Sequence, residues 1–385
     1  MKGKKRILAY LAAMLCAFTS ISCKGQGKDS FYPVAEFPPA NVQYTETGSQ
    51  EKQQAPLNYE TMKGVWISYL EYSWALKGKT QAEFEQTISA MFDQIVSWGL
   101  NTVIVQVRSH GDAYYPSQYY PWSQYASGSV GVSPGFDPLA IMVEQAHQRN
   151  LSIHGWINPY RLMMDEGMNA LSEEYLISQW YHSPGWAEYM QQGSNGYWYL
   201  NPGNEQALLL IVNGVSELVS QYSLDGIQID DYFYTISPEV FGQTAEQARE
   251  NTTKTVKGIY EAVHQQNDSL WFGVSPAGNY LDIPKSDQTQ YTDLVTWCTQ
   301  EGYLDYVSPQ IYWDFDDPVA PFQTVLEKWE NLVKGSPCRL FPGLAAYKFS
   351  GSDHLWDQAK AAEEGKVSNG YLYFRYDDLV KAFGG

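Results

Sequence analysis

The chain has 385 residues, enough for one large domain or two of ordinary size, and 44% of them are hydrophobic, so it can bury a substantial core. Its formal net charge is −18, which argues against a nucleic-acid partner, because binding a phosphate backbone requires a basic face. Aromatic residues make up 15% of the chain, a proportion that fits either stacking platforms for sugars or an aromatic core.

The N-terminus has the pattern of an export signal. Basic residues between positions 2 and 6 precede the apolar run Ile7–Phe18, which is too short to span a bilayer stably. Small residues then lead to Cys23, as in a lipobox, although Ser20 stands where that pattern prefers Leu. We expect residues 1–22 to be a lipoprotein signal peptide and Cys23 to be lipidated, which would anchor an exported protein to a membrane of the bacterial envelope. An ordinary secretory signal is the alternative.

The next segment, residues 23–60, is rich in Gly, Ser, Gln and Pro and predicts a flexible tether. Residues 61–385 are expected to form one folded domain. This part contains Cys298 and Cys338. Two cysteines permit one disulfide, but two buried free thiols fit the sequence equally well.

From Met62 onwards, short apolar runs rich in β-branched and aromatic residues alternate with longer amphipathic stretches. This alternation predicts an α/β fold, specifically a (β/α)₈ TIM barrel. The expected strands are Gly64–Leu70, Thr102–Val107, Ser152–Asn158, Gly226–Asp230, Trp271–Ser275, Tyr306–Tyr312, Leu340–Ala345 and Gly370–Phe374. A doubly wound open sheet is the competing fold, but it would require a Gly-rich phosphate loop after an early strand, and the sequence has none.

Two long segments, His110–Phe136 and Arg161–Pro202, follow the second and third expected strands. We expect them to be irregular βα loops. Barrel enzymes build their active sites from such loops at the C-terminal ends of the strands.

The most informative strand end lies in the run DGIQIDDYFY. Ile227 and Ile229 should face the helices, so Gln228 and Asp230 should face the barrel axis. A polar side chain at that position has few structural reasons to be there, and Asp231 follows at the start of the loop. Two carboxylates here could divide the roles of acid and of nucleophile or stabiliser. The alternative for Asp231 is to cap the following turn.

Four other expected strand ends are unusually polar and aromatic. Amide and guanidinium groups donate hydrogen bonds to sugar hydroxyls, and Trp and Tyr offer stacking faces. The residues expected to bind substrate are Gln106, Arg108, Trp156, Asn158, Tyr160, Arg161, Gln228, Tyr232, Asn279, Gln310, Tyr312 and Trp313. Structural roles are the alternative: Arg108 could be an internal salt-bridge partner, and Trp156 could fill the barrel.

Other hydrolytic chemistries have weaker support. The histidines do not cluster, and no HExxH or paired-cysteine spacing occurs, so we expect no metal and no other cofactor. Ser275 lacks the Gly-x-Ser-x-Gly context of a nucleophilic serine. Carboxylate chemistry is therefore favoured.

The chain resembles, from about Met62 to its C-terminus, the glycosyl-hydrolase-like family ten proteins, many of which are bacterial lipoproteins. The resemblance rests, in order, on GVWISYL, QVRSHGDAYYPSQYYPWS, PGFDPLA, HGWINPYR, YLNPG, DGIQIDDYFY, FGVSPAG, DYVSPQIYW and GYLYF. It implies a barrel and glycoside hydrolysis, with peptidoglycan glycan strands stripped of their stem peptides as the polysaccharide substrate. The matching motif positions are Gln106, Arg108, Gly111, Asp112, Trp156, Asn158, Arg161, Asp230, Asp231, Tyr232, Pro276, Gln310, Tyr312 and Trp313. Ile229, Thr235 and His110 depart from the family pattern.

The resemblance adds Asp112 to Asp230 and Asp231 as a catalytic candidate. Because Asp230 and Asp231 are neighbours, they would approach a sugar from the same side. One solution is a second carboxylate from another strand end: Asp112, Asp314 or Glu71. The other is substrate assistance, in which a 2-acetamido group of the sugar attacks the anomeric carbon.

Two other functions stay open. A barrel without catalysis could hold glycan strands through the same aromatic rim. A metal-dependent polysaccharide deacetylase can carry an Asp-Asp pair, but it also needs a His-x-x-x-His ligand pair, which this sequence lacks.

Overall fold

The computed structural model describes residues 55–230, 233–284, 290–349 and 353–383, all within the unit Val34–Gly385. The predicted signal peptide, Cys23 and the predicted tether up to residue 54 lie outside the described residues, as do Asp231 and Tyr232. Within the described ranges, no helix has the length and apolar character needed to cross a membrane.

The main sheet closes into a barrel of parallel strands. Its order is β10-β9-β8-β7-β3-β2-β1-β12-β11. The two edge strands, β10 and β11, belong to the single segment Arg339–Ala345, since β10 pairs with β9 while β11 pairs with β12. This segment therefore joins the two edges, and the predicted (β/α)₈ barrel is confirmed. The strands are β1 (Met62–Ile67), β2 (Thr102–Arg108), β3 (Ser152–Ile157), β7 (Gly226–Ile229), β8 (Trp271–Val274), β9 (Tyr306–Val307), β10 (Arg339–Leu340), β11 (Gly343–Ala345) and β12 (Gly370–Phe374).

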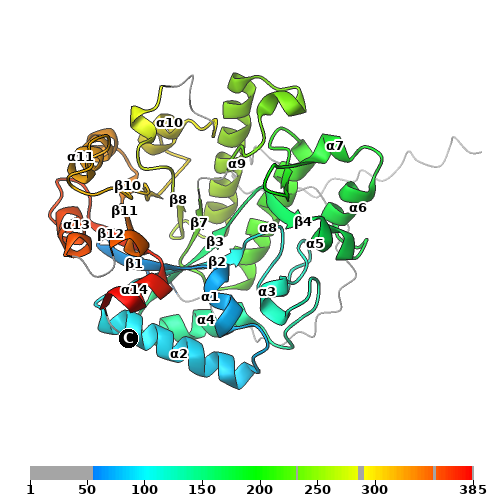
Figure 1. The fold of residues 1–385 in the computed structure, drawn as a ribbon, viewed down its shortest axis with the longest axis horizontal. Coiled ribbons are helices and arrows are strands. Elements are labelled where there is room, and N and C mark those ends of the chain that lie inside the picture. Colours follow the sequence, from blue (N-terminus) through cyan, green and yellow to red (C-terminus); the bar gives the residue numbers. More distant parts are fainter. Residues whose placement is uncertain (1–54, 231–232, 285–289, 350–352, 384–385) are drawn as a thin grey trace, which may run out of the picture. The chain divides into compact units, whose positions relative to one another are not determined.

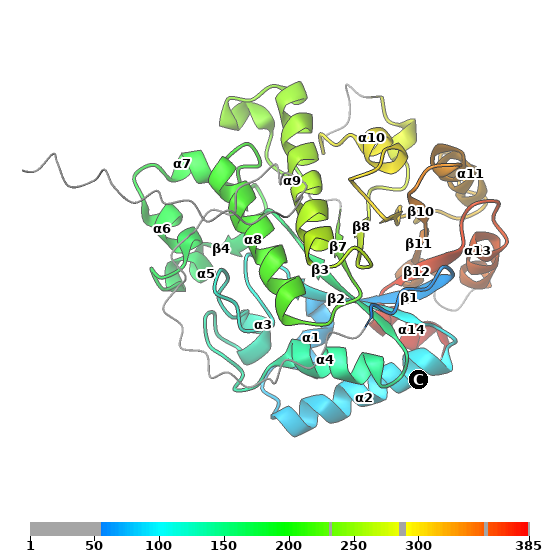
Figure 2. The same cartoon turned by 180° about the vertical axis from the view of Figure 1, so that it is seen from behind.

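Helices follow the strands and lie outside the ring that the strands form (Figures 1 and 2). Several begin with a side-chain cap, such as the capping boxes of Thr80 with Glu83 and of Thr244 with Gln247. The helices after the barrel strands are α1 (Tyr69–Ala75), α2 (Gln81–Ser97), α4 (Pro138–His147), α8 (Glu205–Gln221), α9 (Ala245–Gln266), α10 (Leu294–Thr299), α11 (Phe322–Val333), α12 (Ala346–Phe349), α13 (His354–Glu363) and α14 (Tyr376–Phe383). Two 3₁₀ turns, η1 (Pro238–Phe241) and η2 (Tyr280–Asp282), precede α9 and α10.

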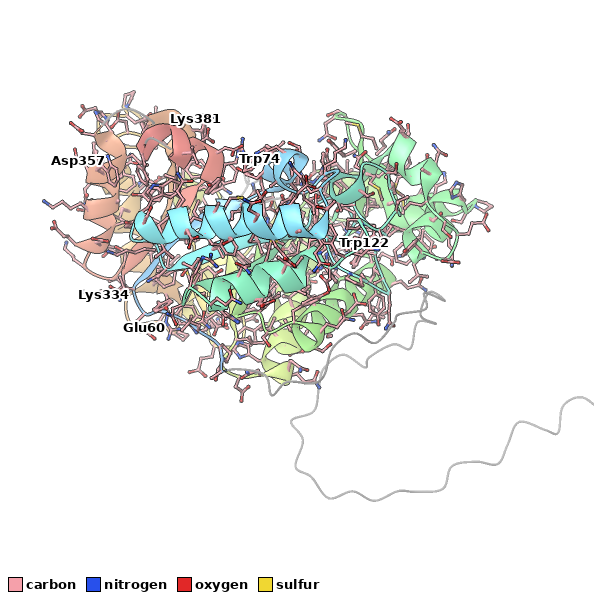
Figure 3. All side chains as sticks on the ribbon, turned by 90° about the horizontal axis from the view of Figure 1, so that it is seen from below. Glu60, Trp74, Trp122, Lys334, Asp357 and Lys381 are labelled. Carbon is pink, nitrogen blue, oxygen red and sulfur yellow. The ribbon has the colours of Figure 1, made fainter. Side chains whose placement is uncertain are left out.

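Figure 3 relates the helix layer to the two ends of the barrel. In it α2 and α4 lie side by side. Trp74, in the helix after β1, lies at the upper edge of this view, and Glu60, just before β1, lies at the lower edge. The C-terminal ends of the strands, where the site is expected, therefore face upwards in Figure 3.

The two long βα segments differ from each other. The first contains one short helix, α3 (Gln124–Ser127), and is otherwise largely irregular, as expected. For the second, the expectation of an irregular loop is wrong. It forms the antiparallel sheet β4-β6-β5 with three helices. Its elements are β4 (Arg161–Met164), α5 (Asp165–Ala170), α6 (Leu176–His182), α7 (Trp186–Tyr189), β5 (Met190–Gln192) and β6 (Tyr197–Leu200). Elements this short contain too few residues to produce a recognisable hydrophobic period.

Side chains alternate between the helix layer and the barrel interior as predicted for β7. Ile227 and Ile229 pack in the large core beneath the helices. Gln228 points inward, where its Oε1 accepts a hydrogen bond from the Trp66 indole. A separate apolar cluster fills the interior, formed by Met62, Trp66, Ile104, Trp156, Trp271, Tyr306, Phe341 and Leu372.

The last residues before β1 are held against the N-terminal end of the barrel. The Leu57 backbone N–H donates to Asp225 Oδ1 at 2.5 Å, and Asn58 Nδ2 donates to the Asp225 carbonyl at 2.8 Å. Asn58 Oδ1 also lies 3.0 Å from His154 Nε2. The end of the segment predicted as a tether is therefore in contact with the folded domain.

The two cysteines of the domain are free thiols, and both are buried. Burial, together with the hydrogen bond to Cys298, raises the pKa of the Cys338 thiol well above its usual value. The side chains are thus in contact across α10 and the start of β10.

Gly273 tests the packing of the barrel interior. A Cβ at this position would overlap the ring of Tyr306. We expect Gly273→Ala to lower the free energy of unfolding by about 1–3 kcal/mol, as for other overpacked cores. Denaturant unfolding measures the change. The control is Gly185→Ala, because Gly185 has no atom within 4 Å of a Cβ and a φ of −99°. Equal stability of the two variants would contradict the close packing of Tyr306 on β8.

Candidate active site

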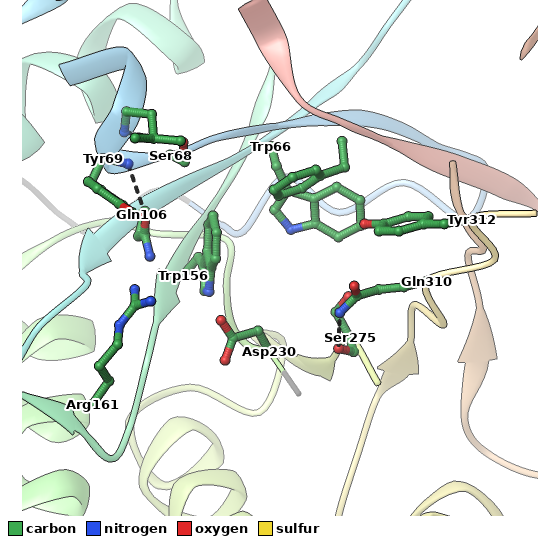
Figure 4. A pocket seen from close by; sticks show the side chains of 12 residues that line it. Trp66, Ser68, Tyr69, Gln106, Trp156, Arg161, Asp230, Ser275, Gln310 and Tyr312 are labelled. Carbon is green, nitrogen blue, oxygen red and sulfur yellow. Dashed lines mark hydrogen bonds between the residues drawn. The ribbon is translucent and has the colours of Figure 1, made fainter. Parts of the chain in front are cut away.

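A pocket of about 300 Å³ opens at the C-terminal ends of the barrel strands. We call it the Asp230 pocket. The side chains that line it come from β1, β2, β3, β12 and β4 or from the residues just after β1, β7, β8 and β9 (Figure 4). They are Trp66, Ser68, Tyr69, Leu70, Gln106, Trp156, Arg161, Asp230, Ser275, Gln310, Tyr312 and Phe374.

A chain of hydrogen-bonded amides leads to the Asp230 carboxylate. Asn158 Nδ2 donates to Asp230 Oδ2. Asn158 Oδ1 accepts hydrogen bonds from Gln106 Nε2 at 2.6 Å and from Arg161 Nη2 at 3.3 Å. Gln106 Oε1 in turn accepts the backbone N–H of Tyr69 at 2.9 Å, one of the contacts drawn in Figure 4.

The direction of this chain is fixed by its first donor. A backbone N–H can only donate, so the Gln106 oxygen must face Tyr69 and its nitrogen must face Asn158. The same reasoning turns the Asn158 nitrogen toward Asp230. The barrel therefore orients the carboxylate and presents a hydrogen-bond donor to its negative charge, a pairing stronger than one between neutral groups. Asp230 itself is 7% exposed, so it is held in place yet open to the pocket.

Aromatic rings form much of the pocket wall. The Phe374 ring lies 6.0 Å from Trp66, 6.1 Å from Tyr312 and 6.5 Å from Trp156, between ring centroids. Gln310 is fixed beside them by a hydrogen bond from its Nε2 to the Ser275 carbonyl at 3.1 Å. A pocket with apolar faces and a few oriented polar groups suits a sugar ring, which has both kinds of surface.

The structure brings many of the predicted site residues together. Asp230, Gln106, Trp156, Arg161, Gln310 and Tyr312 line the pocket. Asn158 and Gln228 are buried directly behind it and contact pocket residues. Besides these two, five predicted residues do not line it: Arg108, Asp112, Tyr160, Asn279 and Trp313.

Arg108 points away from the pocket because β2 contains a bulge. The strand register shifts between Gln106 and Arg108, which places Arg108 opposite the outward-facing Ile157. Its guanidinium lies 4.2 Å from the centroid of the Tyr120 ring. A Cβ on Gly214, inside α8, would overlap this guanidinium, so the glycine makes room for it. Arg108 therefore belongs to the layer between strand and helix, not to the rim.

Asp112 stabilises the loop after β2. Its Oδ1 accepts the backbone N–H groups of Ser109 at 3.0 Å and His110 at 2.7 Å. Tyr160 faces the helix layer, where its hydroxyl donates to Thr255 Oγ1 at 2.8 Å. Asn279 and Trp313 lie near η2, where the Trp313 ring would be 2.9 Å from a Cβ on Gly278.

Six residues of the pocket were not expected as site residues: Trp66, Ser68, Tyr69, Leu70, Ser275 and Phe374. For Trp66, Ser275 and Phe374 the sequence contains a signal that predicts an inward orientation. The alternation that turns Gln228 and Asp230 inward on β7 also turns these three side chains inward when it is counted along β1, β8 and β12.

The remaining carboxylates proposed from the sequence are engaged elsewhere. Glu71 accepts from the Ser68 backbone and hydroxyl and pairs with Arg375. Burial is the main reason that its pKa is raised. Asp314 lies 2.7 Å from His354 Nδ1. Among the described residues that line the pocket, Asp230 is the only carboxylate. The described ranges also contain no group of three or more His, Cys, Asp or Glu side chains arranged to hold a metal ion.

Comparison with known proteins shows the family. The model of Glycosyl hydrolase-like 10 matches residues 61–249 and 245–358. The chain belongs to this family. It is 34% identical to glycosyl hydrolase YngK of Bacillus subtilis over 83% of this chain and 69% of that protein. It is 30% identical to glycosyl hydrolase DigH of Escherichia coli K12 over 89% of this chain and 82% of that one.

Solved structures share the fold at low sequence identity. A family GH13_31 enzyme aligns with a TM-score of 0.52 at 10% identity, covering 84% of this chain and 67% of that one. An α-amylase from Geobacillus thermoleovorans, complexed with acarbose, gives 0.50 at 10% identity, covering 82% and 71%. The family supports a glycosidase-type function, and these structures show the fold.

His110 allows a test of the burial of the loop after β2. Burial and, secondarily, the nearby Arg161 charge lower the pKa of His110 to about 4. We expect its imidazole to stay neutral down to about pH 5 in an NMR titration of the histidine ring signals. Because the unfolded chain binds this proton near pH 6.5, His110 should make the fold less stable as the pH falls from 6.5 to about 4. A midpoint near 6.5 would contradict the buried position.

Proposed function

We propose that the protein hydrolyses O-glycosidic bonds of an envelope polysaccharide, with peptide-free peptidoglycan glycan strands as the substrate. The observation that carries this proposal is the Asp230 carboxylate, oriented by the amide chain through Asn158 in a pocket walled by aromatic rings. A negative charge held in this pocket would stabilise the positive charge that develops in an oxocarbenium-like transition state.

The other candidate carboxylates already have hydrogen-bond or ion-pair partners. This favours substrate assistance over a second nucleophile supplied by the protein. Asp112, Glu71 and Asp314 each hold other partners, and none lines the pocket. A 2-acetamido carbonyl of the substrate would then attack the anomeric carbon, with Asp230 orienting and polarising the acetamido nitrogen. Asp231 is the candidate proton donor to the leaving oxygen. It lies outside the described residues, so this role rests on the sequence.

The charge of the pocket is compatible with a peptidoglycan strand. Once its peptide is removed, N-acetylmuramic acid carries a free carboxylate. Arg161 lines the pocket and offers a positive charge to such a group, while its Nε donates to the Ser109 carbonyl at 2.8 Å. The rival function, a glycan-binding barrel without catalysis, would use the same wall of aromatic rings.

Replacement of the carboxylate tests the mechanism. Asp230→Asn should preserve folding and reduce the release of reducing ends from peptide-free glycan strands by several orders of magnitude. Asp314→Asn is the matched control, since Asp314 also follows a barrel strand but pairs with His354. The turnover of this variant should stay near normal. NMR during hydrolysis should show retention of the anomeric configuration.

Three results would change these assignments. Near-normal turnover of Asp230→Asn would remove Asp230 from the mechanism. Inversion at the anomeric carbon would exclude substrate assistance. Binding of glycan strands by the unsubstituted protein without release of reducing ends would support the rival binding function.

We also propose that the protein is exported and anchored to a membrane through lipid on Cys23, as its N-terminal sequence indicates. Cys23→Ala should move the protein from the membrane fraction to the soluble fraction, because no acyl chain is then attached. Mass spectrometry of the mature N-terminus checks the lipid directly. An unmodified N-terminus at another residue would instead indicate an ordinary secretory signal.

A further inference from the structure

A second cavity, of about 370 Å³, lies next to the Asp230 pocket. It lies between the loop after β2, which carries α3, and the segment of β4 and α5, which lies in the same region of Figures 1 and 2. Five of the residues that line it carry the argument: His110, Tyr125, Ser129, Glu166 and Tyr197.

Tyr69 forms the boundary between the two cavities. It lines the Asp230 pocket, and its ring lies 4.9 Å from both His110 and Tyr125, which line the second cavity. The Tyr197 ring stacks on His110 at 5.1 Å. The aromatic surface of the Asp230 pocket is therefore continuous with that of the second cavity.

His110 places a buried nitrogen directly beside this surface. The side chain is 3% exposed, and its Nε2 has no hydrogen-bond partner within the described residues. Its Nδ1 lies 2.8 Å from Ser109 Oγ, which is also within hydrogen-bond distance of Asp112. Ser109 Oγ also lies 3.2 Å from the Tyr114 hydroxyl, so both neutral tautomers of His110 fit these contacts and Nε2 is a donor in one and an acceptor in the other. In either tautomer Nε2 can pair with a sugar hydroxyl, because a hydroxyl both donates and accepts hydrogen bonds.

The charge of the residues that line the second cavity favours an uncharged sugar unit. Glu166 contributes a carboxylate, and the described lining residues include no lysine or arginine. Glu166 disfavours a unit with its own carboxylate, whereas an uncharged N-acetylhexosamine offers apolar ring faces to the tyrosines and hydroxyl groups to His110 and Glu166.

We infer that the second cavity is a saccharide subsite. It binds an uncharged N-acetylhexosamine unit of a glycan while the neighbouring unit of the same glycan occupies the Asp230 pocket. This inference rests on the proposed function for the identity of the chain that it binds. His110, Tyr125 and Tyr197 then bind substrate, and the protein binds glycans of two or more units more tightly than a single unit.

Binding measurements test the subsite separately from catalysis. With Asp230→Asn as the background, isothermal calorimetry compares chitotetraose with N-acetylmuramic acid, a monosaccharide whose carboxylate directs it to Arg161 in the Asp230 pocket. Tyr125→Ala and Tyr197→Ala should each weaken tetrasaccharide binding about 3- to 10-fold, the usual scale of one aromatic contact, and leave monosaccharide binding unchanged. Tyr303→Ala is the control, because Tyr303 lines a different cavity, beside α9 and α10. It should change neither affinity.

A blocking variant covers the case in which a tyrosine variant fails to fold. Ser129 is exposed and lines the second cavity, so Ser129→Trp should fill it without disturbing the core and should also weaken tetrasaccharide binding. Unchanged tetrasaccharide affinity in the folded variants would overturn the subsite, whether or not glycans are cleaved. Weakened binding without any cleavage by the unsubstituted protein would keep the subsite and overturn the proposed hydrolysis.

Discussion

In a closed barrel of parallel strands, every second side chain points at the axis and must be accommodated there. In this chain the lower part of the interior is filled by large apolar side chains such as Trp271, Tyr306 and Phe341. Glycine at position 273 makes room for the Tyr306 ring. The interior is thus packed up to the level of Trp66 and Trp156, and inward-facing residues beyond that level border open space. The pocket exists because the strands end above a filled core.

At that upper level the inward residues are polar, and their neighbours limit what they can do. Gln106 lies on β2 and Asn158 directly follows the adjacent β3, so their amides bond to each other and carry the direction set by the Tyr69 backbone across to Asp230. The carboxylate receives its donor from the barrel wall rather than from a mobile loop. Such a constellation needs no rearrangement when charge develops on a bound sugar, which is the property required of a group that stabilises a transition state.

The two long βα segments extend this site in different ways. The first is largely irregular, yet Asp112 ties its backbone down next to β2 and so fixes His110 beside Tyr69. The second folds into a small antiparallel sheet that brings Tyr197 onto the same histidine. Residues almost ninety positions apart thereby form one aromatic surface. The pocket and the second cavity share this surface, which gives the active face an extended character suited to a polymer.

The sequence by itself determined the barrel and the inward orientation of Asp230, because strand alternation and hydrophobic periodicity are local properties that can be counted along the chain. It also identified Gln106, Asn158 and Gln310, each at the end of a strand. Only the tertiary structure decided where the side chains of Arg108 and Asp112 lie. A bulge in β2 reversed the side of Arg108, and the turn after it captured the Asp112 carboxylate. The second cavity was equally beyond the sequence, since its wall is made where two distant loops meet, and no local pattern records a contact between segments that are far apart in the chain.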